Sequence, residues 1–384
     1  MTVTAARGFR AAGVTCGLKP SGLPDLALVV NDGPLQAAAG VFTANRVEAA
    51  PVTWSRQVVR DGRVSVVVLN SGGANACTGP PGFADVHATA ERAAAATGVS
   101  AADVAVCSTG LIGERLPMQL LLPGVDVAAA ALGIAGGAAA AEAIRTTDTV
   151  AKTAARASPD GWTVGAMAKG AAMLSPALAT MLVVLTTDAV AEPGVLAEVL
   201  RAATRTTFER VDSDACLSTN DTVLLLASGA SGVTPPRDDL GSLVHEVCAD
   251  LAGQLVADAE GASKEVRVEV VGAATEDEAQ QVARTVARYP LLKCALRGGD
   301  PNWGRVLAAV GTTTAAFDPQ RLDVVMNGVQ VCRGGAIGDP REGVDLRGRH
   351  VTITVDLHAG AADGFVLTND LTEDYVSLNA DYST

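Results

Sequence analysis

The 384-residue chain contains few aromatic and few basic side chains, and each shortage narrows what the protein can be. Phe, Trp and Tyr make up only 3% of the residues, so the core has to be built from Ala, Val and Leu, with 40 glycines allowing close backbone approach. Lys and Arg number 29 against 42 Asp and Glu, which gives a formal net charge of −13. This balance argues against nucleic acid as a partner, because phosphate binding requires clustered Lys and Arg.

Residues that would hold a metal or a disulfide framework are also scarce. The four histidines show no metal-ligand spacing, so we expect no metal site. The seven cysteines include no Cys-x-x-Cys pair, which indicates reduced, mostly buried thiols in a cytoplasmic protein. The first residues lack the apolar core of a signal peptide, and Pro176 within the apolar stretch 170–187 favours a buried element over a membrane span. Nucleophile-elbow, Walker and dinucleotide glycine motifs are absent from the sequence.

The hydrophobic pattern predicts an α/β protein with more than one domain, since 384 residues exceed the usual size of one core. Period-2 and fully apolar runs predict strands at 25–31, 63–70, 104–107, 181–186, 222–226, 264–271, 322–331 and 351–357. Small or amphipathic runs predict helices at 84–96, 126–145, 193–211, 238–258 and 275–289. Asn327-Gly328 is a strong signal for a hairpin within 322–331.

A threonine at the junction of two kinds of sequence is a candidate nucleophile. Residues 170–179 are small and uncharged, and a strand-like apolar run begins at Met181. Thr180 lies at the junction, directly after Ala179. This arrangement suits a chain that cleaves itself between Ala179 and Thr180, because the freed α-amine, with an ordinary pKa of about 7.7–8.0, can act as the base for the threonine hydroxyl. The alternative is an ordinary half-buried strand threonine.

Three further positions carry groups that acyl transfer could use. Thr109-Gly110 follows a short buried strand, and a hydroxyl beside a glycine N–H can donate two hydrogen bonds to one oxygen, which is worth about 3–4 kcal/mol per donor in an oxyanion hole. The alternative for this pair is an ordinary turn. Lys169 is an isolated cation eleven residues before Thr180, and it is either a carboxylate-binding group or a solvated lysine. Glu260 ends a predicted helix, where an acidic residue is unfavourable unless it meets a cation. The alternative for Glu260 is an ordinary surface helix end.

The wider sequence resembles the ornithine acetyltransferases, which are the glutamate N-acetyltransferases of arginine biosynthesis. Matching blocks lie in family order from Gly40-Val41-Phe42-Thr43 to Thr384. They fall around residues 70–79, 107–113, 145–149, 164–188, 218–222, 258–264, 299–310 and 370–384. One departure is Ala172, where the family usually has glycine, and we expect its methyl group to crowd the turn before the cleavage point.

The resemblance implies a role for nine residues. Thr180 is the nucleophile, Ala179 precedes the cleaved bond, and Thr109 and Gly110 form the oxyanion hole. The implied substrate-binding residues are Thr147, Lys169, Thr180, Glu260, Asn379 and Thr384. Because Thr146 and Thr147 are adjacent and alike, the sequence leaves open which of the two faces the substrate.

The implied fold is an αββα-like sandwich of stacked sheets flanked by helices, with a smaller C-terminal α+β domain. Residues 1–179 are then the α chain and the first part of the sandwich. Residues 180–263 begin the β chain and complete the sandwich. Residues 264–384 form the C-terminal domain, whose tail returns to the active site. The implied assembly is a heterotetramer of two α and two β chains.

The implied reaction transfers an acetyl group from N-acetylornithine to glutamate by a ping-pong mechanism through acetyl-Thr180. It needs no cofactor, and acetyl-CoA stays open as an alternative acetyl donor. Two other interpretations are kept. One is an aminopeptidase or amidase of the same self-cleaving architecture, in which water resolves the acyl-enzyme. The other is a non-catalytic binding protein that retains the fold.

Overall fold

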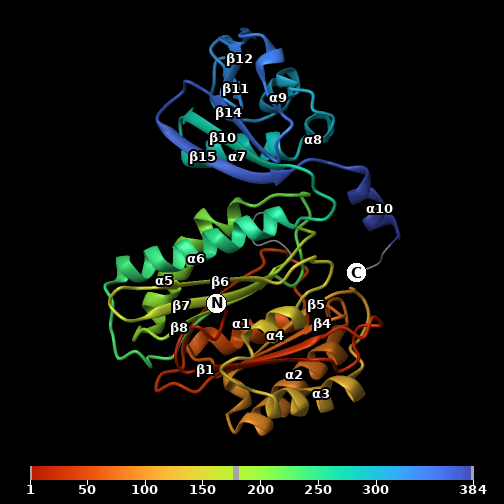
Figure 1. Ribbon diagram of the computed structural model, residues 1–384, viewed down its shortest axis with the longest axis vertical. Coiled ribbons are helices and arrows are strands. Elements are labelled where there is room, and N and C mark those ends of the chain that lie inside the picture. Colours follow the sequence, from red (N-terminus) through yellow and green to blue (C-terminus); the bar gives the residue numbers. More distant parts are fainter. Residues whose placement is uncertain (1, 176–180, 382–384) are drawn as a thin grey trace. The chain divides into compact units, whose positions relative to one another are not determined.

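The computed structural model describes residues 2–175 and 181–381, which divide into two compact units (Figure 1). Within those ranges, the first unit comprises residues 2–175, 181–209 and 216–255. The second unit comprises residues 210–215 and 256–381. The second unit thus includes a short segment from the middle of the sequence together with the C-terminal third of the chain.

Two sheets form the centre of the first unit. The four-stranded sheet has the order β1 (Phe9–Val14), β2 (Leu26–Asn31), β4 (Val66–Ser71), β5 (Val104–Thr109). The five-stranded sheet has the order β3 (Ala37–Phe42), β9 (Thr222–Ala227), β8 (Leu182–Thr187), β7 (Thr163–Lys169), β6 (Lys152–Ala157). The β4–β5 and β8–β9 pairs are parallel, and the other neighbours are antiparallel. Parallel pairing places the ends of β4 and β5 side by side, and likewise the beginnings of β8 and β9.

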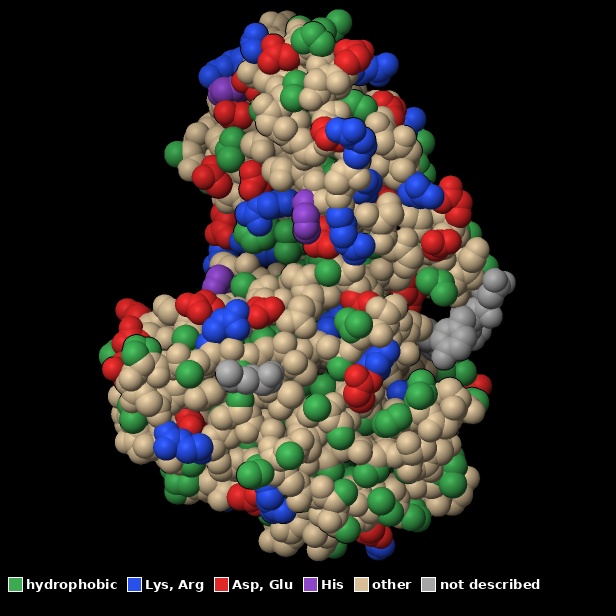
Figure 2. Space-filling model, viewed as in Figure 1, with side chains coloured by type: hydrophobic (Ala, Val, Ile, Leu, Met, Phe, Trp, Pro, Cys, Tyr) green, Lys and Arg blue, Asp and Glu red, His purple; other side chains and the backbone are tan. Residues whose placement is uncertain are grey.

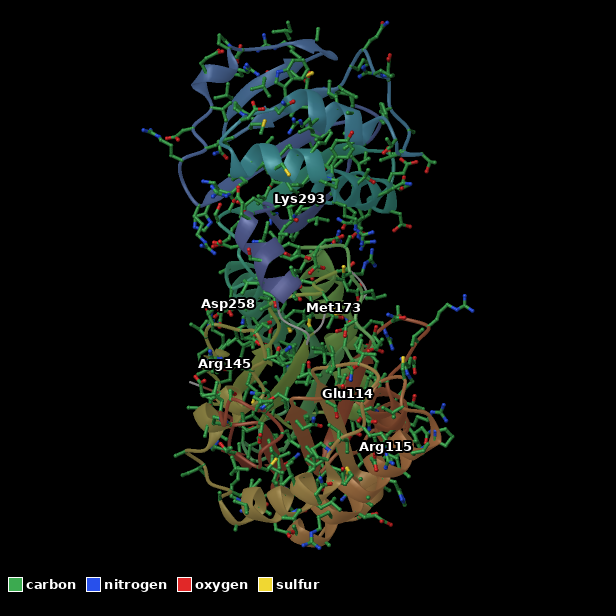
Figure 3. The ribbon with its side chains drawn as sticks, turned by 90° about the vertical axis from the view of Figure 1, so that its right-hand side faces the viewer. Glu114, Arg115, Arg145, Met173, Asp258 and Lys293 are labelled. Carbon is green, nitrogen blue, oxygen red and sulfur yellow. The ribbon has the colours of Figure 1, made fainter. Side chains whose placement is uncertain are left out.

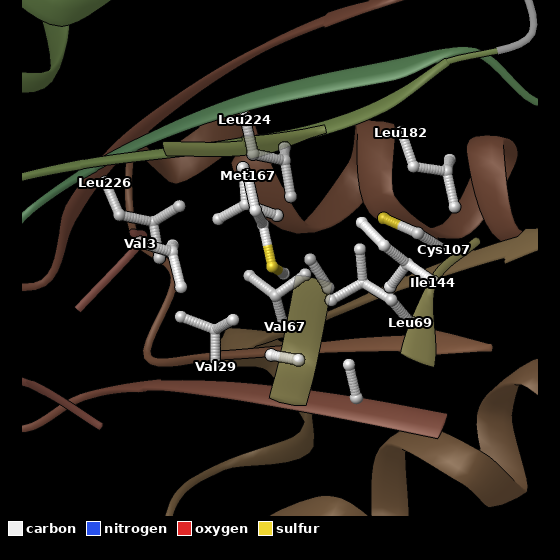
Figure 4. Packing of buried hydrophobic residues seen from close by; sticks show 14 of the residues in the cluster. Val3, Val29, Val67, Leu69, Cys107, Ile144, Met167, Leu182, Leu224 and Leu226 are labelled. Carbon is white, nitrogen blue, oxygen red and sulfur yellow. The ribbon is translucent and has the colours of Figure 1, made fainter. Parts of the chain in front are cut away.

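Aliphatic side chains fill the space between these two sheets. Val29, Val67 and Leu69 of the four-stranded sheet belong to the same buried cluster as Leu182 and Leu224 of the five-stranded sheet (Figure 4). Successive side chains of a strand point to opposite faces, so each strand contributes every second residue to this layer. The sheets are therefore stacked face to face, and a core of Val, Leu and Ala replaces the missing aromatics.

Helices cover the outer faces of the two sheets. Val68 and Val106 on the far side of the four-stranded sheet form a second buried cluster with Ala90 of α2 (Gly79–Thr97) and Leu121 of α3 (Met118–Ala130). Over the five-stranded sheet lie α5 (Pro193–Thr206) and α6 (Arg237–Ala257) (Figure 1). The helices α1 (Ala50–Val58) and α4 (Gly137–Ala143) differ, because Val52 of α1 and Ala140 of α4 belong to the buried cluster between the two sheets. The first unit is thus the predicted αββα sandwich.

The second unit is a six-stranded sheet with helices. Its strand order is β13 (Ala336–Ile337), β12 (Val329–Arg333), β11 (Asp323–Met326), β14 (His350–Asp356), β10 (Glu265–Ala273), β15 (Ala362–Asn369). Its helices are α7 (Glu276–Ala287), α8 (Pro290–Arg297), α9 (Trp303–Val310) and α10 (Glu373–Asp381). Val268 of β10 and Val282 of α7 belong to one buried cluster, so α7 packs on the sheet. Short 3₁₀ helices also occur, η1 (Val59–Asp61), η2 (Ala101–Asp103), η3 (Phe208–Arg210) and η4 (Arg341–Gly343).

Most predicted elements are confirmed within a few residues, including the β11–β12 hairpin at Asn327-Gly328, where both φ angles are positive. The helix predicted at 126–145 is wrong. It is two helices, because α3 ends at Ala130 and α4 begins at Gly137. Between them Gly133 pairs with Ala11 of β1, and a Cβ at Gly136 would lie 1.8 Å from the Ala11 carbonyl oxygen. The glycines that break the helix thus let the chain approach the edge strand.

The cysteines are less buried than the sequence predicted. All seven are free thiols, but only Cys107, Cys248 and Cys332 are buried. Cys77, Cys216 and Cys294 are exposed, and Cys16 is partly buried.

Residues 2–175 and 181–381 offer neither a membrane span nor a metal-binding cluster. Within these ranges, no helix has the length and apolar character needed to cross a membrane. The same ranges hold no cluster of three His, Cys, Asp or Glu side chains that could bind a metal ion. On the face shown in Figure 2, acidic and basic side chains are intermingled.

Candidate active site

The predicted oxyanion pair lies where β5 ends. Thr109 is the last residue of β5 and is buried, and its carbonyl accepts hydrogen bonds from the N–H groups of Gly72 and Gly73, both at 3.0 Å. Gly110 follows with a φ of +131°, a conformation that L-residues rarely adopt. A Cβ at Gly110 would lie 2.5 Å from the Gly73 nitrogen. The end of β5 is therefore held by hydrogen bonds from the turn at Gly72 and Gly73, and only glycine fits at position 110.

Lys169 meets Thr109 across the two sheets. Lys169 ends β7 in the five-stranded sheet, and its Nζ donates a hydrogen bond of 3.3 Å to Thr109 Oγ1. Both residues are 2% exposed, so Lys169 is not the solvated lysine of the alternative interpretation. Because the threonine oxygen accepts from the ammonium, its own O–H proton can be donated to another oxygen. The predicted oxyanion group and the predicted cation thus form one site.

A buried carboxylate holds the segment next to Lys169. Asp148 Oδ1 accepts hydrogen bonds of 2.7 Å from both Lys152 Nζ and the Gly170 N–H, and Oδ2 accepts one of 3.0 Å from the Thr146 N–H. Although burial alone would raise it, the charges of Lys169 and Lys152 hold the pKa of the Asp148 carboxyl well below its ordinary value. Asp148 therefore stays ionised beside two ammonium groups, and this part of the site favours a negatively charged ligand.

The two threonines that the sequence left open lie beside this carboxylate. Thr146 and Thr147 are both half-buried. The guanidinium of Arg145 donates to the carbonyls of Asp148 and Thr149 and so closes the turn that contains them (Arg145 in Figure 3). Thr146 is fixed through its backbone N–H to Asp148, whereas Thr147 is the residue at the middle of the turn.

Ala179 and Thr180 lie outside the described residues, and the neighbouring residues define the surroundings of the predicted cleavage point. Met181 is fully buried, and its N–H donates a hydrogen bond of 3.0 Å to Asp221 Oδ1. On the other side of the gap, Met173 has a φ of +53°. Ala172 is half-buried and is not among the residues with positive φ, so alanine needs no unusual backbone conformation there.

The loop 218–221 was matched to the family without an assigned role, and it proves to connect the parts of the site. The Asn220 side chain donates to the carbonyls of Ala74 and Ser108, at 2.6 Å and 2.9 Å. It thereby holds β5 immediately before Thr109. The next residue, Asp221, accepts the hydrogen bond from the Met181 N–H. Strand pairing between distant segments creates these contacts, so no local sequence signal could have revealed them.

Glu260 and Asn379 form a separate pair in the second unit. Glu260 lies three residues beyond the end of α6, in a turn with Gly261, and it accepts a hydrogen bond of 2.8 Å from the Asn379 side chain in α10. A Cβ at Gly261, whose φ is +62°, would lie 2.4 Å from the Tyr375 nitrogen, so the turn packs directly on α10. The predicted substrate residue Thr384 lies outside the described residues.

Glu260 lines a cavity of about 130 Å³ that belongs entirely to the second unit. Asp214, Asp370 and Lys293 also line it. Lys293, labelled in Figure 3, donates through Nζ to the carbonyls of Ser213 and Asn369 and to Thr368 Oγ1. Burial lowers the pKa of Lys293 to about 8. With its three protons used in these contacts, Lys293 is a structural cation, and Glu260 contributes a carboxylate to the wall.

The sequence of this chain is similar to the sequences of known proteins. The profile of the ArgJ family matches residues 10–384. The arginine biosynthesis bifunctional protein ArgJ of Streptomyces coelicolor is 65% identical over 384 residues, with full coverage of both chains. The protein of the same name from Mycobacterium tuberculosis is 57% identical over 389 residues, covering 100% of this chain and 96% of its own.

Two solved structures are also similar to this chain. A Bacillus halodurans arginine biosynthesis bifunctional protein argJ is 35% identical with a TM-score of 0.50, and the match covers 52% of this chain and 98% of that one. An ornithine acetyltransferase from M. tuberculosis, solved with ornithine, is 58% identical with a TM-score of 0.45, covering 47% of this chain and 96% of that one. From the family match and the full-length relatives, the chain belongs to the ArgJ family, the acyltransferases of arginine biosynthesis.

Proposed function

We propose that this chain cleaves itself between Ala179 and Thr180 and then transfers the acetyl group of N-acetylornithine to glutamate through an acetyl-Thr180 intermediate. The observation that carries the proposal is the contact between Lys169 and Thr109, beside Gly110 and within the same unit as Met181. This contact joins the positive charge of Lys169, at the end of β7, to the hydroxyl of Thr109, at the end of β5. The neighbouring strand β8 pairs with β7 and follows directly on Met181, the residue after Thr180.

In the first half of the reaction, the α-amine of Thr180 takes the hydroxyl proton while Oγ attacks the acetyl carbonyl carbon. The Thr109 hydroxyl and the Gly110 N–H donate to the oxygen that becomes negative. When the carbon–nitrogen bond of N-acetylornithine breaks, the proton passes to the departing nitrogen and ornithine leaves. The acetyl group is then an ester on Thr180.

In the second half, the amine of glutamate attacks this ester and regenerates the Thr180 hydroxyl. Both substrates carry a carboxylate, for which Lys169 and Thr147 are the partners that we propose. The free δ-ammonium of N-acetylornithine needs a negative partner, and Glu260, with Asn379 bonded to it, supplies one. Thr384 completes the proposed set of substrate contacts.

The proposed enzyme works in the cytoplasm as a heterotetramer of two α and two β chains, without a cofactor. Support for separate chains comes from the B. halodurans structure, whose chain aligns over 98% of its length with only 52% of this one. The acetyl-CoA-dependent acetylation of glutamate is a second activity that we keep open, because the same acetyl-threonine would serve either donor.

The proposal is tested with the purified protein and three mixtures. N-acetylornithine with glutamate should give ornithine and N-acetylglutamate in equal amounts. Acetyl-CoA with glutamate tests the second donor. N-acetylornithine alone separates the transferase from an amidase, because an amidase would release acetate without glutamate. Mass spectrometry of the active protein should show two chains divided before Thr180, and an intact, active 384-residue chain would refute the self-cleavage.

A further inference from the structure

We propose that Lys19 is a further substrate-binding residue, whose ammonium group binds the second carboxylate of the acceptor, glutamate. This inference rests on the proposed function and deepens it. Glutamate carries two carboxylates, whereas N-acetylornithine carries one carboxylate and one ammonium group. Lys169 and Thr147 are the proposed partners of the carboxylate that both substrates share, and Glu260 has the wrong charge for a second one. The acceptor therefore needs one more cation than the donor does.

The loop that carries Lys19 lies against the turn beside the predicted oxyanion pair. A Cβ at Gly72 would lie 2.9 Å from the Leu18 carbonyl oxygen, so the backbone just before Lys19 touches this turn. The N–H of the same Gly72 donates to the Thr109 carbonyl at 3.0 Å. Lys19 is thus one residue away from a direct contact with the turn that holds the end of β5.

A buried carboxylate fixes this loop in place. The side chain of Asp25 is fully buried and accepts hydrogen bonds from the N–H groups of the four successive residues 16–19, at 2.6–3.2 Å. The Asp25 carbonyl accepts the Ser71 N–H at 2.9 Å, which ties the loop to the end of β4. The Ser71 hydroxyl donates to the carbonyl of Ala143 at 2.6 Å, at the end of α4 and two residues before Arg145. The loop and the turn at Arg145 are therefore both held at the end of β4.

The charge of Lys19 is not neutralised by an ion pair. Among residues 2–175 and 181–381, no carboxylate pairs with Lys19, whose half-buried side chain donates instead to the Pro24 carbonyl at 2.7 Å. The oxygens of nearby Asp25 already accept four backbone N–H groups. Lys152, by comparison, pairs with Asp148 at 2.7 Å. An ammonium group has three protons to donate, so Lys19 can bind a carboxylate without giving up its contact with Pro24.

Lys19 adds a positive charge to a site that already holds others. Burial lowers the pKa of Lys19 below its ordinary value, and the charges of Lys169 and Arg145 act in the same direction. The carboxylates of Asp25 and Asp148 oppose this shift. Cations gathered in this way repel one another, and a negatively charged ligand relieves the repulsion. Because the Arg145 guanidinium closes its own turn, we assign Lys19 and Lys169 to the two carboxylates of glutamate.

The test compares Lys19→Met with Lys19→Arg and with Arg10→Gln. Lys19→Met keeps a chain of similar length without the charge, and Lys19→Arg keeps the charge. Arg10→Gln removes a positive charge at the opposite end of the β1–β2 pair, where Arg10 forms an ion pair with Asp32. Steady-state kinetics with both substrates varied give the KM for glutamate and the KM for N-acetylornithine separately. Thermal unfolding of each variant checks the fold.

The expected effect is confined to the acceptor. Lys19→Met should raise the KM for glutamate about tenfold to hundredfold, because a hydrogen bond between two charged groups is lost, and should leave the KM for N-acetylornithine nearly unchanged. Lys19→Arg should recover most of the loss, and Arg10→Gln should behave as the wild type does. An unchanged KM for glutamate in Lys19→Met, or an equal rise in the KM of both substrates, would overturn the assignment.

Exchange of labelled ornithine into N-acetylornithine needs no glutamate, so it separates this inference from the proposed function. Lys19→Met should catalyse the exchange at nearly the wild-type rate. A loss of exchange as large as the loss of transfer to glutamate would mean that Lys19 supports the site as a whole and does not recognise the second carboxylate. If the wild-type chain catalyses neither exchange nor transfer, the proposed function fails and this inference fails with it.

Discussion

Lys169 and Thr109 are 60 residues apart in sequence, yet the Lys169 ammonium donates to the Thr109 hydroxyl at 3.3 Å. One residue ends a strand of the five-stranded sheet and the other ends a strand of the four-stranded sheet. The contact exists only because the sheets stack face to face. The site therefore depends on the sandwich itself, and changes at either strand end should affect chemistry more than stability.

Thr109→Ala removes one of the two proposed oxyanion donors together with the hydrogen-bond acceptor of Lys169. We expect the chain to fold and the turnover number to fall by about 10²–10³-fold, as the loss of one such donor does in other enzymes. Thr109→Ser, which keeps the hydroxyl, is the control and should retain most of the activity. Steady-state kinetics with N-acetylornithine and glutamate check this, and an unchanged turnover number in Thr109→Ala would mean that Thr109 is only a turn residue.

Gly110→Ala tests the other donor through the backbone. The added methyl group would lie 2.5 Å from the Gly73 nitrogen at a φ of +131°, so the turn has to move. We expect a loss of stability of about 1–3 kcal/mol and a large loss of turnover. Gly113→Ala is a matched control, since Gly113 has a φ of +90° but nothing within 4 Å of the new methyl group. Equal effects of the two substitutions on turnover would contradict an oxyanion role for the Gly110 N–H.

Asp148→Asn should change how stability depends on pH. A lowered pKa in the folded chain means that the Asp148 carboxylate contributes stability above its ordinary pKa and loses it as pH falls through the folded pKa. The variant should therefore be destabilised at neutral pH, by about 3–5 kcal/mol because Lys152 stays buried without its ion pair. The difference from wild type should shrink as the pH falls below about 4.

Chemical denaturation at several pH values measures this effect. Asp148→Asn combined with Lys152→Met removes both partners of the buried pair and should recover part of the lost stability. A difference between wild type and Asp148→Asn that stays constant from pH 7 to pH 3 would show that the Asp148 charge does not matter.

Local patterns in the sequence predicted many of the strands and helices and one end of the site, whereas the sandwich arrangement was implied by the family resemblance. Thr109-Gly110 was recognisable as a hydroxyl and a glycine after a buried strand, and the structure keeps it so. By contrast, β6 and β7 were not predicted, because Lys152, Gly165 and Lys169 interrupt the apolar alternation of these strands. Both lysines are buried in the folded chain, which no local pattern indicates.

Glu260→Gln tests the proposed partner of the δ-ammonium of N-acetylornithine. The amide would still accept the hydrogen bond from Asn379 that Glu260 accepts now, so the turn before β10 should keep its structure. Losing one hydrogen bond to a charged group costs about 1.5–3 kcal/mol, so we expect the KM for N-acetylornithine to rise about tenfold to hundredfold. Self-cleavage should survive, because no substrate takes part in that step.

The control for this prediction is Glu373→Gln in α10, which removes a largely exposed carboxylate of the same unit that pairs with Arg297. It should leave the KM unchanged, because exposed ion pairs contribute little. A second comparison uses glutamate, which has no δ-ammonium, so the KM for glutamate should change much less in Glu260→Gln than the KM for N-acetylornithine. If both constants rose together, Glu260 would support the shape of its cavity and would not recognise the ammonium group.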